Sequence, residues 1–478
     1  MMRLDEYRGK PVVILGLARS GAAAAKLFRA AGAVVTANDR KDRSECPEAD
    51  ELEALGITVV CGGHPDGLVN EETALLVKNP GIPYTAEPVR KALRLGVEVV
   101  TEVEVAGQLS PAPIIGITGS NGKTTTTTWT GELLKAAGLK PVVAGNIGRP
   151  LCDAAREIGP DGWLVVELSS FQLKGTSAFH PRVACLLNVA ETHLDYHGTM
   201  QDYIASKAKL FANQTEEDVA VWNADDPVCR ELAAEFRARS LPFSLSRRLE
   251  CGVAVEPPFP PGLPDGSGLD EAERWIVYRD PAGAEHRILP VGRLGIPGRH
   301  NAANALAAAA VALAAGVRPE QLAGPLESFR GVEHRLERVG SFRGVHYVND
   351  SKATNPAATA MSVYALPPGL VLIAGGLDRG SDYMELLPVF RDRVKAVVAV
   401  GQTREKIRKV AEAAGLSAGK VVEPVGDAEE TLKQAVREAA ALAQPGDTVL
   451  LSPACASWDM FPSYEVRGRI FKQSAHTL

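Results

Sequence analysis

Six consecutive residues of this chain carry the side chains needed to hold a triphosphate. They are Gly119, Ser120, Asn121, Gly122, Lys123 and Thr124, and Thr125 follows them. Closely spaced glycines let backbone N–H groups approach an anion, Lys123 can neutralise the β and γ phosphates, and the Thr124 hydroxyl can bind Mg²⁺. The usual P-loop string asks for a glycine where this chain has Ile117, so the match is one residue off. The order of residue types nevertheless predicts a nucleoside triphosphate site.

Two side chains further along could hold the metal ion that accompanies such a site. Glu167 ends an apolar run, which is where a Mg²⁺-binding carboxylate belongs in a P-loop protein. An acid in that place is otherwise a cap or a surface charge. His193 follows another apolar run and could reach the same ion, or could instead make a hydrogen bond within its loop.

Lys207 is the least expected cationic residue of this region. It lies in a helical run over residues 202–213 that also contains Lys209. An ammonium pointing into a site with Lys123 and Mg²⁺ would be repelled unless it were neutral or modified. Spacing alone favours a solvated helix lysine and does not distinguish Lys207 from Lys209.

Polar residues of unusual variety follow three apolar runs in the last third of the chain. The runs end in the loops 349–356, 375–380 and 452–459. Structural turns seldom need an acid, a base, hydroxyls and amides within eight residues, so the first loop favours a functional reading over a structural turn. Since all three loops follow strands, they could line one edge of a sheet.

The phosphate site requires a strand before it and a helix after it. Residues 114–117 are apolar and predict the strand, and Lys123 opens a helical run through Lys135. Further strands are predicted at 141–144, 163–168 and 183–189. Residues 249–289 alternate and contain many Pro and Gly, which indicates short antiparallel strands at one edge. An Ala-rich helix is predicted over 302–315.

The N-terminal region predicts another parallel α/β unit. Its strand 11–17, helix 20–31 and strand 33–37 form a βαβ start, and more strands are predicted at 58–60, 74–78 and 97–100. The turn from Gly16 to Gly21 lacks the middle glycine of a dinucleotide fingerprint. A nicotinamide-dependent dehydrogenase, a plain α/β turn and a different nucleotide therefore all stay open for this unit.

A third unit begins near residue 332, with strands predicted at 336–339, 345–348, 369–374, 396–400 and 448–451. Helices are predicted between them, at 402–414 and 429–442. The fold class is therefore α/β with three domains: a Rossmann-like N-terminal domain, a central P-loop ATPase with a mostly parallel sheet, and a Rossmann-like C-terminal domain. We place them at 1–110, 111–331 and 332–478.

Composition restricts the possible partners and the compartment. The net charge of −6 over 478 residues provides no broad basic surface, so we expect no nucleic acid partner. The seven cysteines are scattered without a CxxC pair, which is typical of reduced core residues in a cytosolic protein. No apolar run is long enough to span a bilayer. We expect a cytoplasmic monomer without membrane insertion.

Seven strings resemble the Mur ligases of peptidoglycan synthesis and occur in the order of that family. They are TGSNGKTTT, ELSSFQL, LNVAETHLDYHGT with the following YIASKAKLF, GRHNAANALAA, GVEHRLERV, NDSKATNP and LLSPACASWDMF with the trailing Arg-Gly pair at 467–468. Together they cover most of the chain. The strings around residues 350–355 and 452–457 are most similar to the D-glutamate-adding branch, and the Asp-Asn-Pro-Arg string of the diamino-acid-adding branch is absent from the sequence.

The resemblance implies a role for each matched residue. Lys123, His193 and Lys207 would be catalytic, and Mg²⁺ would be held by Thr124, Glu167, His193 and Lys207, the last at the carbamylated-lysine position. The P-loop residues 119–125 would bind ATP together with Asn301, Asn304, Arg335 and Asp350. D-glutamate would face Lys352, Thr354, Arg379, Ser457 and Tyr464. The UDP-sugar would be held by Ala18, Arg19, Ser20, Asp39, Arg40, Asn79, Gly81, Asn146 and Ser169.

The reaction implied by the family is ATP-dependent amide formation between UDP-N-acetylmuramoyl-L-alanine and D-glutamate through an acyl phosphate. ATP and Mg²⁺ would be the cofactors. A folylpolyglutamate synthase shares this chemistry but has no need of the N-terminal βαβ unit. A GTPase-type binding protein is a further alternative, although the guanine-reading [NT]KxD string is absent from the sequence.

Overall fold

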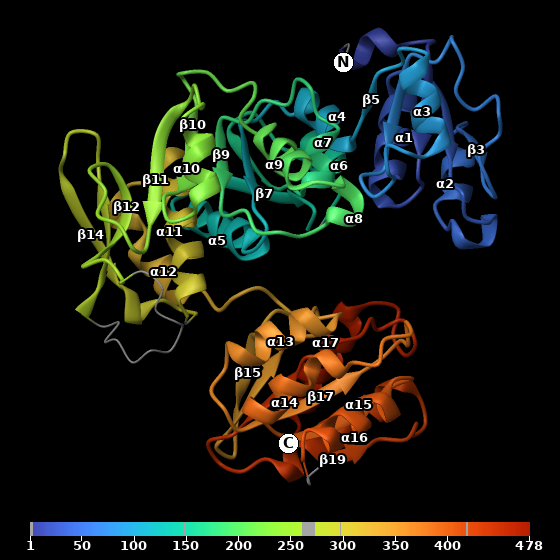
Figure 1. The fold of residues 1–478 in the computed structure, drawn as a ribbon. Coiled ribbons are helices and arrows are strands. Elements are labelled where there is room, and N and C mark those ends of the chain that lie inside the picture. The colour runs from blue at the N-terminus through green and yellow to red at the C-terminus, as the bar shows by residue number, and fades with distance from the viewer. Residues whose placement is uncertain (1–2, 148, 261–272, 297, 417–418) are drawn as a thin grey trace. The chain divides into compact units, whose positions relative to one another are not determined.

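The computed structural model describes residues 3–147, 149–260, 273–296, 298–416 and 419–478. The chain divides into two compact units, Met1–Phe329 and Arg330–Leu478. Figure 1 shows helices packed around sheets in both units. The described strands form three separate sheets, of five, nine and six strands. This arrangement confirms the predicted three-part α/β fold class, while the domain boundaries at residues 110 and 331 stay predictions.

The N-terminal sheet is parallel throughout, in the order β3-β2-β1-β4-β5. Its strands are β1 (Pro11–Leu15), β2 (Val34–Asn38), β3 (Thr58–Val60), β4 (Leu75–Lys78) and β5 (Val99–Val100), and its helices are α1 (Arg19–Ala30), α2 (Ala49–Ala54), α3 (Glu87–Arg94) and α4 (Glu102–Leu109). The chain adds strands on one side of β1 and then returns to its other side with β4. Such a switch point opens a crevice at the carboxyl ends of the strands, where ligands of this fold class bind.

The central sheet has the order β14-β13-β12-β11-β10-β9-β6-β8-β7. Its strands are β6 (Ile114–Thr118), β7 (Lys140–Gly145), β8 (Gly162–Glu167), β9 (Val183–Leu186), β10 (Val219–Asn223), β11 (Arg239–Ser244), β12 (Gly252–Glu256), β13 (Trp275–Arg279) and β14 (Glu285–Pro290). The pairs from β7 to β12 are parallel, and β12-β13 and β13-β14 are antiparallel. The antiparallel edge predicted within 249–289 is therefore confirmed.

Helices cover this central sheet and position its loops. They are α5 (Lys123–Ala136), α6 (Leu151–Glu157), α7 (Ser170–Lys174), α8 (Leu194–His197), α9 (Met200–Ala208), α10 (Pro227–Ala233), α11 (Arg299–Ala314) and α12 (Ala323–Ser328). Helix α11 packs against α5 and is buried over most of its length. Its many alanines allow this, because small side chains let two helices approach closely.

The C-terminal unit holds the sheet β15-β16-β20-β17-β18-β19. Its strands are β15 (Glu337–Phe342), β16 (Val345–Asn349), β17 (Leu370–Gly375), β18 (Val394–Val400), β19 (Gly419–Val421) and β20 (Thr448–Leu451). Its helices are α13 (Pro356–Tyr364), α14 (Leu387–Arg393), α15 (Arg404–Ala413), α16 (Ala428–Leu442) and α17 (Tyr464–His476). Among the described strand pairs of this unit, only β15-β16 is antiparallel. The neighbouring strands β16, β20 and β17 therefore end at one edge of the sheet.

Several predicted elements end earlier than expected. The first strand stops at Leu15 because Gly16 takes the left-handed φ of 94° and its N–H donates to Asn38 O of the next strand. The helix predicted over 202–213 is regular only to Ala208. All seven cysteines are free; five are buried, and Cys61 and Cys251 are half-buried. Among the described residues no helix is long and apolar enough to cross a membrane.

Candidate active site

The loop between β6 and α5 has the geometry of a phosphate cradle. Strand β6 is fully buried, and α5 begins at Lys123 directly after Gly122, which takes a φ of 82°. A Cβ on Gly119 would lie 2.8 Å from Leu187 Cβ, so this loop also needs glycine for close packing. The backbone N–H groups at the start of α5 and the helix dipole favour an anion at this point.

The phosphate cradle is tied to the loop that follows β9. Asn188 Oδ1 accepts from Asn121 N at 2.8 Å, and Ser120 Oγ accepts from Ala190 N at 2.8 Å. This loop leads to His193, which has a left-handed φ of 57° and is the N-cap residue of α8 (Leu194–His197). The hydrogen bonds therefore bring the segment that carries His193 beside the phosphate cradle.

Lys207 lies beneath the cradle and is only 1% exposed. Its Nζ donates to Gly119 O at 2.8 Å and lies 4.7 Å from the centroid of the Tyr203 ring. Burial, and then the nearby Lys123 ammonium, lower the pKa of Lys207 well below its ordinary value. The solvated helix lysine that spacing alone favoured is therefore wrong for Lys207. Spacing could not reveal this, because the end of α9 is covered by a loop distant in sequence.

Lys123 points back onto its own loop. Its Nζ donates to Gly119 O and Ser120 O, at 2.9 Å each. Both Lys123 and Lys207 thus donate to the same carbonyl of Gly119. The cradle holds the Lys123 ammonium and the N-terminus of a helix, and this positive charge suits a polyphosphate.

Glu167 ends β8 and is 2% exposed. Its Oε1 accepts from Asn146 Nδ2 at 2.8 Å, while its Oε2 has no hydrogen-bond partner among the described residues. A buried carboxylate oxygen without a partner is costly unless a cation or water completes it. Ser169 caps α7 two residues later through a hydrogen bond from Gln172 N. Neither the cap nor the surface-charge reading describes Glu167 itself.

Asn304 of α11 lies directly over the cradle. A Cβ on Gly122 would be 2.2 Å from Asn304 Oδ1. Thr126 Oγ1 donates to Asn304 Oδ1 at 3.4 Å, and Asn304 Nδ2 donates to Asn301 Oδ1 at 3.5 Å. The structure thus brings the predicted Asn301 and Asn304 to the phosphate loop from a helix more than 170 residues further along the chain.

The predicted UDP-sugar residues of the N-terminal sheet gather at its carboxyl edge. Leu17 N, just before Ala18, Arg19 and Ser20, donates to Asp39 Oδ2 at 2.9 Å. On the other side of β1, a Cβ on Gly16 would lie 2.7 Å from Asn79 Cβ, and Asn79 Oδ1 accepts from Gly81 N at 3.2 Å. Arg40 is exposed beside this crevice.

The missing middle glycine of this N-terminal turn has a structural explanation. A Cβ on Gly21 would lie 1.9 Å from Gly16 O, so only the outer two glycines are needed for helix α1 to pack against the turn. The middle position is Ala18, which is exposed. The turn is therefore complete as an α/β turn without the full dinucleotide fingerprint.

In the C-terminal unit, Asp350 is 2% exposed and follows β16. Its carboxylate accepts from Ser452 Oγ at 2.7 Å and from Leu336 N at 3.2 Å. Burial raises the pKa of Asp350 to about 6, against the opposing effect of hydrogen bonds from Ser362 and Ser452 and of the Arg335 charge. Asp350 and Arg335 are thus neighbours within this unit.

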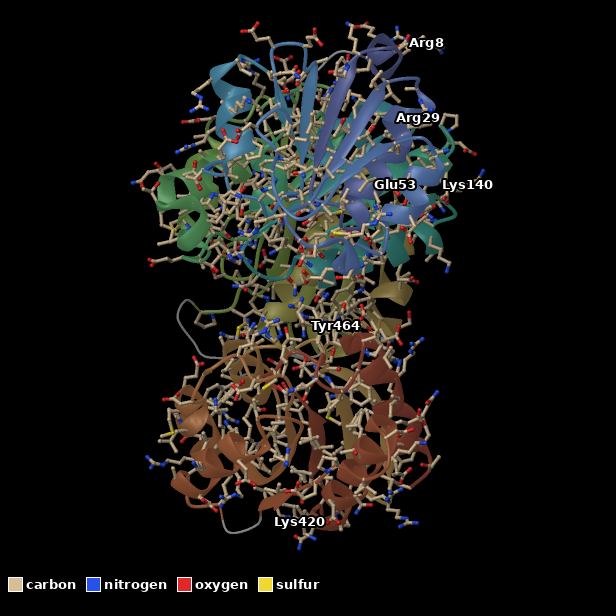
Figure 2. All side chains as sticks on the ribbon, turned by 90° about the vertical axis from the view of Figure 1, so that its right-hand side faces the viewer. Arg8, Arg29, Glu53, Lys140, Lys420 and Tyr464 are labelled. Atoms are coloured by element: carbon tan, nitrogen blue, oxygen red, sulfur yellow. The ribbon has the colours of Figure 1, made fainter. Side chains whose placement is uncertain are left out.

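The predicted amino-acid residues come together in the loops after β16, β17 and β20. Lys352 Nζ lies 5.8 Å from the Tyr464 ring centroid, and the Arg379 guanidinium lies 5.3 Å from that of Trp458. Ser457 is 2% exposed and precedes Trp458, which is 66% exposed. Tyr464, labelled in Figure 2, begins α17. Thr354 is half-buried in the loop of Lys352.

Two residues that hold the loops of the site in place were not predicted from the sequence. Tyr203 lies between Ser120, whose Oγ is 2.8 Å from the tyrosine hydroxyl, and Lys207. Arg467 is 3% exposed and donates to Ser351 Oγ, Ser351 O and Cys455 O, so it joins the loops after β16 and β20. Its only signal in the sequence was its place in the Arg-Gly pair that trails the last string.

Comparison with known proteins decides the family. Residues 10–101 match the Mur ligase MurD-like N-terminal domain, residues 117–258 the Mur ligase middle domain, and residues 334–455 the Mur ligase glutamate ligase domain. A protein of Geobacillus kaustophilus named UDP-N-acetylmuramoylalanine–D-glutamate ligase is 48% identical over 474 residues, which cover 99% of this chain and 98% of that protein. The chain belongs to the Mur ligase family. A protein of Shouchella clausii with the same name is 46% identical to this Mur ligase and covers all of its length.

Solved structures agree in fold at low identity. The UDP-N-acetylmuramate-alanine ligase of Thermotoga maritima has a TM-score of 0.58 and 18% identity, and the alignment covers 98% of this Mur ligase and 99% of that chain. The MurF of Acinetobacter baumannii has a TM-score of 0.55 and 21% identity, with 92% and 89% covered. These structures support the three-sheet architecture.

Proposed function

We propose that this Mur ligase adds D-glutamate to UDP-N-acetylmuramoyl-L-alanine in peptidoglycan precursor synthesis, with cleavage of ATP to ADP and phosphate. The observation that carries the proposal is the identity of 48% along 99% of the chain with a ligase named for this reaction. The match of residues 10–101 to a Mur ligase domain also argues against the dehydrogenase, GTPase and folylpolyglutamate synthase alternatives.

The substrate that supplies the carboxylate occupies the N-terminal crevice in this proposal. Ala18, Arg19, Ser20, Asp39, Arg40, Asn79 and Gly81 hold the UDP-sugar there, and Asn146 and Ser169 of the central sheet contribute to its binding. The crevice lies at the switch point of a parallel sheet, where nucleotides of this fold class bind. The backbone N–H groups at the start of α1 suit the diphosphate.

ATP occupies the cradle formed by residues 119–125. Asn301 and Asn304 approach it from α11, and Arg335 and Asp350 are the nucleotide ligands that we propose from the C-terminal unit. Lys123 is placed at a helix start, where its charge can follow the transferred phosphoryl group. In the structure the Lys123 ammonium stays within this loop, where it donates to Gly119 O and Ser120 O.

The donor set fits a magnesium ion. The partnerless Oε2 of Glu167 is a buried anionic oxygen that a cation would complete. Among the described residues no three His, Cys, Asp or Glu side chains gather to hold a metal. Mg²⁺ uses one or two carboxylates together with phosphates and waters, and Glu167 supplies one such carboxylate. Thr124, Glu167, His193 and a modified Lys207 would hold it, and it would neutralise charge on the phosphates.

We propose that Lys207 acts as a carbamate. Its low pKa provides the neutral amine that can attack CO₂, forming an N–C bond and releasing one proton. The product is an anion with two oxygens beside a cationic site. The modification removes the repulsion between Lys207 and Lys123, which explains why a lysine can occupy this buried place.

The chemistry then needs no side-chain nucleophile. The L-alanine carboxylate of the UDP-sugar attacks the γ-phosphorus of ATP and releases ADP, which leaves an acyl phosphate. The amine of D-glutamate attacks this carbonyl carbon, loses a proton and expels phosphate through a tetrahedral intermediate. Lys123 stabilises the charge on the transferred group, and the chain's loops hold the two reactants in position.

D-glutamate is recognised by the C-terminal loops in this proposal. Lys352 and Arg379 supply two cationic groups for its two carboxylates, and Ser457, Thr354 and Tyr464 supply hydroxyls. Arg467 holds the loops in place from below. The pairing of each cation with an aromatic ring limits its rotamers before the substrate arrives.

Phosphate release from ATP tests this function directly. The purified protein is incubated with ATP, Mg²⁺, UDP-N-acetylmuramoyl-L-alanine and one amino acid from a panel. We expect turnover with D-glutamate and none above background with L-glutamate, L-alanine or L-lysine. Comparable rates with all four amino acids would overturn the assignment. Light scattering after gel filtration checks the further proposal that the enzyme works as a monomer.

A further inference from the structure

Lys78 is a buried lysine that the proposed chemistry does not use. It is the last residue of β4, and it is 1% exposed. Its Nζ donates to Ile82 O at 2.8 Å, to Pro80 O at 3.2 Å and to the Tyr196 hydroxyl at 3.2 Å. It also lies 4.8 Å from the centroid of the Tyr84 ring. In the described parts of the chain Lys78 forms no ion pair.

A lysine in this place needs an explanation, because burying an amine without a carboxylate is unfavourable. Burial, and then the nearby Lys174 charge, lower the pKa of Lys78 to about 7. An apolar side chain would fill the end of β4 at less cost. The contacts of Lys78 go to the carbonyls of residues 80 and 82, so the amine fixes the path of the loop that contains Asn79 and Gly81.

Tyr196, a residue of a helix in the central part of the chain, holds the same loop. Its hydroxyl donates to Pro80 O at 3.1 Å and meets Lys78 Nζ. It lies in α8, three residues after His193. The Tyr196 ring packs edge-on against Phe171 at 4.5 Å, and Phe171 packs against the His193 ring at 5.0 Å. One hydroxyl thus joins the loop after β4 to the segment that carries His193.

We propose that Lys78 and Tyr196 are positioning residues, which lock the loop 79–82 against α8 and so orient the bound UDP-sugar relative to the ATP phosphates. The inference rests on the proposed function, since it assigns the sugar to this loop. Neither residue touches a reacting atom. Their role is to fix the approach of one substrate to the other, which matters because a displacement of about 1 Å can lower a rate roughly a hundredfold.

Two variants remove the contact with little change in shape. Tyr196→Phe deletes only the hydroxyl and keeps the ring that packs on Phe171, and Lys78→Met keeps the length of the side chain without its donor. Lys91→Met is the matched control. Lys91 is a lysine of the same sheet region, and its Nζ also donates to a backbone carbonyl, that of Asp66, but at the surface.

Steady-state kinetics and calorimetric titration with the UDP-sugar are measured for each variant. We expect Tyr196→Phe and Lys78→Met each to lower kcat/KM for UDP-N-acetylmuramoyl-L-alanine roughly tenfold, while KM for ATP stays within about twofold. The double variant should lose less than the product of the two single losses, because the two side chains hold the same loop and share the Lys78–Tyr196 hydrogen bond. The control should behave as wild type.

Three results would overturn the inference. They are wild-type kinetics in Tyr196→Phe, a double variant whose loss of kcat/KM is the product of the two single losses, and a rise in KM for ATP as large as the loss of kcat/KM for the UDP-sugar. If Lys78→Met fails to fold, Tyr196→Phe decides alone. An inactive wild-type enzyme with D-glutamate would instead refute the proposed function. An active wild type with unaffected variants refutes only the positioning role.

Discussion

The two ends of helix α5 provide a matched pair of substitutions that tests the nucleotide site. Gly122 before the helix has a φ of 82°, and Gly138 after it has a φ of 81°. A Cβ on Gly122 would lie 2.2 Å from Asn304 Oδ1, whereas a Cβ on Gly138 would meet nothing within 4 Å. Alanine at either position therefore carries the same backbone strain. Only Gly122→Ala also displaces Asn304.

The expected costs follow from these contacts. Replacing a glycine of left-handed φ by alanine strains the folded backbone, and this strain is partly offset because alanine has less conformational freedom than glycine in the unfolded chain. The net loss of folding free energy is about 1 kcal/mol. At Gly122 the added Cβ would lie 2.2 Å from Asn304 Oδ1, which is 1.2 Å closer than the ordinary contact limit of 3.4 Å. Asn304 must rotate away and lose its hydrogen bonds to Thr126 and Asn301, each worth up to about 1 kcal/mol. We expect about 1 kcal/mol for Gly138→Ala and about 2–3 kcal/mol for Gly122→Ala.

Thermal unfolding and ATP titration measure the two consequences. About 1 kcal/mol corresponds to a Tm shift of roughly 2–4 °C for a domain of this size. Gly138→Ala should lose about that much and bind ATP as wild type, while Gly122→Ala should lose two to three times as much and bind ATP weakly. In an Asn304→Ala background the stability cost of Gly122→Ala should fall to that of Gly138→Ala. Equal Tm losses in the wild-type background, or an unchanged cost in the Asn304→Ala background, would refute the reasoning.

Three further predictions concern lysines. Lys123→Ala should abolish phosphate release while the Tm stays close to wild type, because this lysine supplies charge and not packing, and substantial residual activity would place the site elsewhere. Lys207→Ala should be nearly inactive and partly rescued by acetate in excess, whereas Lys209→Ala should not be rescued, because the Lys209 amine donates to Lys174 O and Thr176 O instead. Between pH 7 and pH 9, the free energy of unfolding of the wild type should rise relative to that of Lys78→Met by up to about 1.4 kcal/mol per pH unit. The reason is that the Lys78 amine has a pKa of about 7 in the folded protein and 10.5 in the unfolded chain, so in this pH range only the unfolded chain keeps the proton. Parallel plots of Tm against pH for the two proteins would contradict this prediction.

Some strands gave no clear pattern in the sequence. Strand β11 contains Pro242, and a proline normally argues against an interior strand. The structure accommodates it because β12 pairs only with Phe243 and Ser244, so the ladder on that side begins after the proline. Strand β10 ends in half-buried residues and was likewise not predicted. Pairing with neighbouring strands decides whether such a segment becomes a strand, and the residue pattern within one segment does not reveal that pairing.

The sequence by itself determined the chemistry of the phosphate loop, the parallel α/β class and the family. Each depends on residues close together in the chain, such as the run from Gly119 to Thr124, where local order is enough to predict a strand, a turn and a helix. Only the tertiary structure decided the burial of Lys207, the missing partner of Glu167 Oε2 and the contact between Lys78 and Tyr196. Burial and pairing depend on which distant segments cover a side chain. A local pattern carries no information about that covering, because the neighbours are separated by 118 residues in the case of Lys78 and by 88 in the case of Lys207.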